Sequence, residues 1–147
     1  MVRPKAAAPL ASPDEIEQQF YEAMRRGDIE RLMAVWSDDE EISCVHPGGP
    51  RVIGAGAIRS AFESIFANGV INVQPEKVRR LQTHTCSVHS VLEHIQLMTA
   101  DGPQSAWVVA TNVYVKTAQG WRLVSHHASP GSPRGVQEIV EAASVLH

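Results

Sequence analysis

The sequence lacks several features that would assign it to a specialised class of protein. Only two of its 147 residues are cysteines, and both Cys44 and Cys86 lie in apolar, strand-like runs where free buried thiols are common. No basic run is present and the formal net charge is −3, so nothing indicates a nucleic-acid or membrane-surface partner. The longest apolar stretches fall far short of a bilayer span. Neither a glycine-rich phosphate loop nor an internal repeat is visible.

What remains is the composition of an ordinary globular protein. Hydrophobic residues make up 44% of the chain and charged residues 20%, which is enough apolar material for the core of one domain. The opening segment, MVRPKAAAPLASP, carries two positive charges but no hydrophobic region of the kind found in signal peptides. We therefore expect residues 1–12 to form a flexible arm and the protein to be cytoplasmic.

The first half of the sequence has the periodicity of helices. Ser12, Pro13 and Glu15 predict a capped helix that ends at Gly27, and Asp28 can cap a second, shorter helix. A short strand at about 41–46, a turn and an extension at 51–53 follow. A third helix is predicted before Asn68-Gly69.

After residue 70 the pattern becomes that of strands, at about 70–81, 84–98, 105–117 and 120–129. Helices first and adjacent strands last predict an α+β fold with an antiparallel sheet. The tail, residues 131–147, could form a short amphipathic helix with apolar residues on one side (Val136, Ile139, Val140 and Ala143).

Three stretches carry a resemblance to a known family: AVWSDDEEISCVHPGG (34–49), GAGAIRSAF (54–62) and ATNVYVKTAQGWRLVSHHAS (110–129). Over residues 13–130 the chain resembles the SnoaL-like and ketosteroid-isomerase-like proteins of the nuclear-transport-factor-2-like superfamily. The resemblance implies a cone-shaped curved antiparallel sheet wrapped around three N-terminal helices, with a pocket at its open end. It also implies a homodimer packed through the outer sheet face. It does not imply one reaction, because the superfamily places many functions on this scaffold.

Strand alternation selects candidates in the last strand, where neighbouring side chains point to opposite faces. His126 and His127 therefore cannot both face the cone. We expect His127 to face inward, because it shares a face with the apolar Trp121 and Leu123. The alternative is a strand-end histidine on the outer face.

Two further candidates interrupt apolar or strand-forming rows. Asn112 shares a face with Tyr114, and a buried amide there could hold an oxyanion; alternatively it is a polar residue on the exposed face. Glu93 interrupts an apolar row, where burial would raise its pKa and suit it to acid–base work. The alternative for Glu93 is a rim carboxylate paired with Arg122. His89 lies on the Glu93 face, but roughly 13 Å away along the strand.

His46 ends the first strand directly before Pro47-Gly48-Gly49, where the cone fold has its open mouth. It is either a proton-exchanging group at the pocket rim or a residue that stabilises the turn.

The candidate wall of the ligand pocket consists of large aromatic residues: Trp36, Phe62, Trp107 and Tyr114. Core packing is the alternative for the first three. Cys44-x-His46 and His84-x-Cys86 lack a close second pair, so we expect neither a metal nor another cofactor.

The sequence thus predicts a small-molecule pocket with catalytic candidates His46, Glu93, Asn112 and His127. The expected chemistry is an isomerase, cyclase or lyase step by proton transfer next to a carbonyl. The alternative is a non-catalytic ligand-binding or dimeric association domain. A strongly shifted pKa in the pocket would favour the enzyme.

Overall fold

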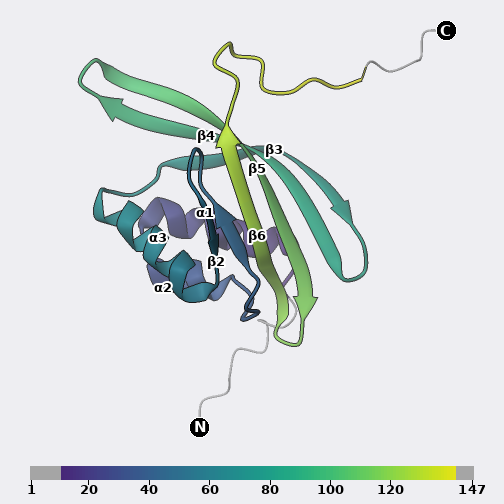
Figure 1. Cartoon of the computed structure of the whole chain (residues 1–147). Coiled ribbons are helices and arrows are strands. Elements are labelled where there is room, and N and C mark those ends of the chain that lie inside the picture. The colour runs from purple at the N-terminus through teal and green to yellow at the C-terminus, as the bar shows by residue number, and fades with distance from the viewer. Residues whose placement is uncertain (1–10, 142–147) are drawn as a thin grey trace, which may run out of the picture.

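The computed structural model describes residues 11–141, and helices and strands occupy residues 13–130 of this range. The helices are α1 (Pro13–Arg26), α2 (Ile29–Ala34) and α3 (Ala55–Ala67). The strands are β1 (Ser43–Val45), β2 (Arg51–Ile53), β3 (Val73–Gln82), β4 (Cys86–Thr99), β5 (Gly102–Thr117) and β6 (Gly120–Pro130). They form one six-stranded sheet in the order β2-β1-β6-β5-β4-β3. The sheet curves over the three helices, as predicted (Figure 1).

Helix α1 begins and ends with the capping groups that the sequence predicts. The Ser12 side chain accepts from the Glu15 backbone N–H, and the Glu15 side chain accepts from the Ser12 backbone N–H. Gly27 ends the helix with a positive φ of 62°, which glycine adopts without steric cost. These caps fix the start and end of the helix that brings two functional side chains into the interior.

Strands β3 to β6 pair in antiparallel fashion through consecutive hairpins, as predicted. The short β1 departs from the predicted antiparallel sheet, because it pairs parallel with β6. Between β1 and β6 the chain passes through β2, α3 and strands β3 to β5, and this long connection allows the two strands to run parallel. The far end of the β4–β5 hairpin projects away from the helices (Figure 1).

Strand β6 contains a bulge that changes which side chains face inward. Tyr114 pairs with Leu123, but the adjacent Val113 pairs with Ser125, so Val124 is an extra residue in the ladder. Before the bulge the odd-numbered Trp121 and Leu123 are buried. After it the even-numbered residues are buried, namely His126 and Ala128.

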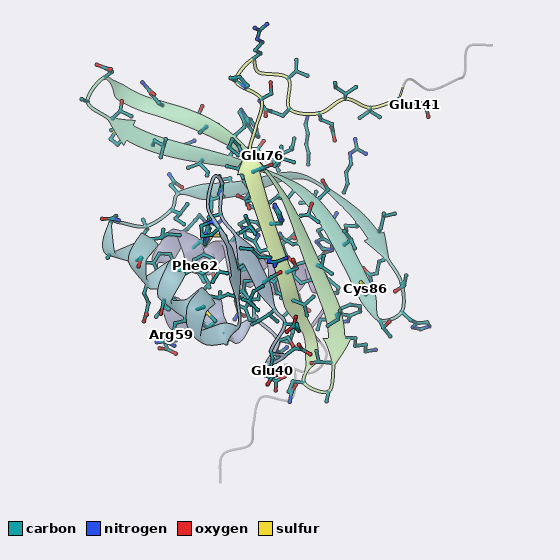
Figure 2. All side chains as sticks on the ribbon, viewed as in Figure 1. Glu40, Arg59, Phe62, Glu76, Cys86 and Glu141 are labelled. Carbon is teal, nitrogen blue, oxygen red and sulfur yellow. The ribbon has the colours of Figure 1, made fainter. Side chains whose placement is uncertain are left out.

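Side chains from the helices and from the concave sheet face fill the space between them (Figure 2). Phe20 lies at the centre, with its ring edge-to-face against Tyr21, Trp36 and Phe62. Burial of such aromatic rings provides much of the stability of a core. Phe62 is fully buried, so α3 is fixed against the sheet.

The C-terminal tail does not form the predicted helix in residues 132–141, which are extended or in turns; residues 142–147 lie outside the described part. Instead, the tail contacts the convex side of the sheet, where the Gly131 N–H donates to the Trp107 carbonyl. Arg79 and Glu138 form an ion pair at 2.6 Å. Most of the predicted N-terminal arm, residues 1–10, also lies outside the described residues.

Candidate functional site

A row of four inward side chains crosses the sheet beneath α1. His89 on β4 pairs in register with Asn112 on β5, Asn112 with His126 on β6, and His126 with Cys44 on β1. All four are buried. Neighbouring strands are about 4.8 Å apart, so side chains in such a row are in contact range.

The histidine that faces the interior is His126, and the prediction of His127 was wrong. His126 is only 3% exposed, whereas the His127 side chain is exposed on the convex face. The bulge at Val124 is the physical reason, because one extra residue exchanges the two faces of the strand beyond it.

Helix α1 contributes two polar residues that the sequence reasoning missed. Glu17 and Tyr21 are four residues apart, so they lie on one helix face, and both are buried. Oε2 of Glu17 accepts from the Tyr114 hydroxyl at 2.7 Å, from Nδ1 of His89 at 2.9 Å and from Nδ2 of Asn112 at 3.2 Å. A carboxylate within an otherwise apolar helix stripe was the available sequence signal.

Asn112 is buried between the helix and the strands, and both of its amide hydrogens are used. Nδ2 donates to Glu17 and, at 3.0 Å, to the Tyr21 hydroxyl. Oδ1 contacts Nδ1 of His126. The predicted role as an oxyanion donor therefore does not fit the geometry, because the amide has no hydrogen left to donate.

Glu93 is buried on β4, as expected for a group with a shifted pKa. Its Oε2 accepts a hydrogen bond from the Tyr21 hydroxyl at 2.7 Å. Burial raises the pKa of Glu93 to about 7; the Tyr21 hydrogen bond partly opposes the rise, and the charge of Glu17 adds to it. The alternative of a rim carboxylate does not describe a side chain that is 5% exposed.

His46 follows β1 and packs against the same interior. Its ring lies edge-to-face against Phe62 at 4.8 Å and is 6.2 Å from the His126 ring. Burial lowers the pKa of His46.

Cys44 lies nearby, and burial, helped by the charge of Glu93, raises the pKa of its thiol to about 12. Cys44 therefore remains a thiol at neutral pH and is not a nucleophile.

The four predicted wall residues occupy three different environments. Trp36 and Phe62 are part of the core, and Tyr114 donates its hydroxyl to Glu17. Trp107 does not face the interior; it lies on the convex face, where its ring stacks on His94 at 4.5 Å. Its odd position on β5 is opposite to the inward Val108, Ala110 and Asn112, so the alternation of the strand explains the error.

A pocket of about 210 Å³ between α1 and β3 reaches this network, because its lining includes Glu17 and Tyr21. Arg25 and Arg80 lie at the same pocket, and Arg80 pairs with Asp14 at 2.8 Å. Strand β3 is irregular beside it, where Lys77 has a φ of 46° and the pairing with β4 shifts register. The pocket therefore lies against two members of the network.

Within residues 11–141, no group of three or more histidine, cysteine or acidic side chains is arranged to hold a metal ion. In the same part of the chain no helix is long and apolar enough to cross a membrane.

Comparison with protein families identifies the fold. A family model described as SnoaL-like domain matches residues 14–133. The chain belongs to the SnoaL-like family. Structures of nuclear-transport-factor-2-like proteins share its fold, including one from Salmonella enterica with 18% identity and a TM-score of 0.71, covering 86% of this chain and 93% of that chain. No curated protein matches the sequence.

Two solved structures are more similar in sequence to this SnoaL-like chain. One, from Thiobacillus denitrificans, is provisionally named as a calcium/calmodulin-dependent protein kinase type II association domain; it is 32% identical, covers 82% of this chain and 96% of its own, and has a TM-score of 0.75. The other, from Streptomyces avermitilis, is provisionally named as a dehydratase of the same superfamily. It is 33% identical, covers 80% and 92%, and has a TM-score of 0.70.

Proposed function

We propose that this SnoaL-like protein binds a small molecule and catalyses proton transfer next to a carbonyl group, as an isomerase, cyclase or lyase. The observation that carries the proposal is the buried carboxyl of Glu93, whose pKa of about 7 leaves both protonation states populated near neutral pH. A general acid or base works best when its pKa lies near the working pH. The name of the Streptomyces avermitilis relative, a dehydratase, agrees with a lyase step.

The residues around Glu93 support such chemistry. The Tyr21 hydroxyl hydrogen-bonds to Glu93, so it orients the carboxyl and favours its ionised form. Tyr21 also lines the pocket between α1 and β3, which makes it the proposed point of contact between ligand and network. His46 stays the proposed rim residue, because it is half-buried against Phe62.

The test begins with a thermal-shift screen of small ketones, carboxylates and aromatic polyketides. Each carbonyl compound that binds is then incubated with the protein in D₂O, and exchange of its acidic C–H is followed by proton NMR. We expect wild-type protein to catalyse exchange and Glu93→Gln to lose about 100-fold or more of that rate, the usual contribution of a general acid or base. Glu40→Gln, a change in an exposed loop, is the matched control and should exchange like wild type. Exchange in Glu93→Gln at the wild-type rate would exclude Glu93 as a general acid or base.

The second candidate is an association domain, favoured by the 32% identity to the Thiobacillus denitrificans protein named for that role. In this proposal the chain forms a homodimer through the convex sheet face, where three valines of β5 are half-buried: Val109, Val113 and Val115. A protein that dimerises but neither binds nor exchanges any screened carbonyl compound would favour this candidate over the enzyme.

A further inference from the structure

The hydrogen bonds around Asn112 determine which way its amide faces. A carboxylate only accepts hydrogen bonds, so the amide atom 3.2 Å from Oε2 of Glu17 must be the donor, Nδ2. The hydrogen bonds of the Tyr21 hydroxyl require the same orientation of the Asn112 amide. The hydroxyl donates its only hydrogen to Glu93 and must accept from Asn112. The oxygen of the amide therefore faces β6.

This orientation in turn determines the state of His126. Oδ1 of Asn112 contacts Nδ1 of the ring, and an amide oxygen only accepts, so Nδ1 carries a hydrogen. The His126 side chain is buried, and its neighbours include the rings of Phe20 at 5.1 Å and His46 at 6.2 Å. Burial, with a contribution from the neighbouring His46 and His127, lowers the pKa of His126 to about 3, so a second proton does not bind at neutral pH.

We propose that Asn112 is a positioning residue that holds His126 as the neutral tautomer with its proton on Nδ1, so that Nε2 presents a lone pair to the interior. The ligand of this site is then a molecule that offers a hydroxyl or an acidic C–H next to a carbonyl. Only this statement about the ligand rests on the proposed function; the position of the proton on Nδ1 follows from the contacts.

The proposed step, in which the ligand lies between Nε2 of His126 and the carboxyl of Glu93, balances its protons without any other reactant. Nε2 takes the proton from the carbon next to the carbonyl, and the C–H electron pair forms the C=C bond of the enol. Protonated Glu93 gives its proton to the carbonyl oxygen, and the C=O π pair moves to that oxygen. The products are a neutral enol, a carboxylate and an imidazolium that still donates through Nδ1 to Asn112.

Glu17 completes the positioning, because it fixes the side of Asn112 that faces away from His126. The same oxygen of Glu17 also binds His89 and Tyr114, so three strand residues are held by one helix carboxylate. His89 faces a carboxylate where His126 faces an amide. Both buried histidines beside Asn112 therefore donate through Nδ1, His89 to a carboxylate and His126 to an amide oxygen.

The experiment is long-range ¹H–¹⁵N NMR of the histidine side chains in the full chain at neutral pH. We expect a protonated Nδ1 and an unprotonated Nε2 for His126, and the His126→Gln variant assigns the signals. His127, exposed on the same strand, is the internal control and should show the averaged signals of a solvated ring. A His126 that carries its proton on Nε2, or on both nitrogens, would overturn the proposal.

Asn112→Leu tests the positioning role with little change in shape, because leucine cannot accept a hydrogen bond from Nδ1 of His126. We expect the proton of the neutral ring to move from Nδ1 to Nε2 and the C–H exchange rate to fall at least about 10-fold. If wild-type His126 has the proposed tautomer but Asn112→Leu leaves the proton on Nδ1, Asn112 is not the residue that fixes it. If the ring changes and exchange does not, His126 is not the base. The NMR result does not depend on Glu93, whose own variant tests the proposed function separately.

Discussion

Glu93 and His126 are buried ionisable residues whose effects on stability have opposite dependence on pH. The pKa of Glu93 is raised from 4.5 to about 7, so between these values the folded protein holds a proton that the unfolded chain releases. Stability from this residue is fully present below pH 4.5 and is lost as the pH rises to 7. The pKa of His126 is lowered from 6.5 to about 3, so protonation of the unfolded chain removes stability as the pH falls below 6.5.

The variant Glu93→Gln separates the two effects. It keeps an acceptor for the Tyr21 hydroxyl but cannot ionise, so the Glu93 effect disappears and the His126 effect remains. We expect the free energy of unfolding of the variant, relative to wild type, to increase by ~3 kcal/mol between pH 4.5 and pH 7. Urea unfolding at several pH values measures this difference. A difference that does not change with pH would mean that Glu93 is ionised in the folded protein throughout this range.

Strand alternation predicted some of these residues and failed for others, for physical reasons. It placed Glu93, Asn112 and Tyr114 on the inward faces of β4 and β5, because these two strands pair without a register shift. It failed for His127, because the bulge at Val124 in β6 has no glycine or other sequence mark. The partners of a buried polar residue could not be predicted either, since they come from elements distant in sequence.

Helix α1 contributes both to the hydrophobic core and, through Glu17 and Tyr21, to the candidate site. Its capping box and terminal glycine are local features, so its position in the sequence was predictable. Its role in the network was not, because Glu17 and Tyr21 meet their partners only when the sheet closes over the helix. The polar contacts that it makes with β4 and β5 each join residues at least 72 positions apart.

Loss of the cap should weaken this element measurably. We expect Ser12→Ala to lower the free energy of unfolding by about 1 kcal/mol, since both reciprocal hydrogen bonds of the capping box depend on Ser12. Ser60→Ala is the matched control, because Ser60 is exposed in the interior of α3 and alanine is the better helix former there. Chemical denaturation of both variants measures the effect. Equal stabilities would show that the cap contributes nothing to the folded protein.

At the scale of the whole molecule, the order of helices and strands was predictable from the sequence. The contacts that segments make at the edge and on the convex face of the sheet were not. Apolar periodicity and turn residues define the elements locally, so the four long strands and three helices lie close to the predicted ranges. The parallel pairing of β1 and the extended tail depend on contacts between distant segments. The tail contacts the convex face near Trp107 and Leu92. In the sequence this face is visible only as a second set of alternating apolar residues in the strands.

The remaining convex face leads to a prediction about assembly. Val113 lies near the centre of β5 and is half-buried. If two copies pack through this face, Val113→Arg places an unpaired charge in the interface, which costs about 2–5 kcal/mol. We expect the variant to dimerise about 30-fold or more weakly than wild type in sedimentation velocity runs at micromolar concentrations. Gln119→Arg, in the exposed turn between β5 and β6, adds the same charge outside the face and should dimerise like wild type. A monomeric wild-type protein, or equal dimerisation of Val113→Arg, would contradict association through the convex face and leave its valines as surface residues of a monomer.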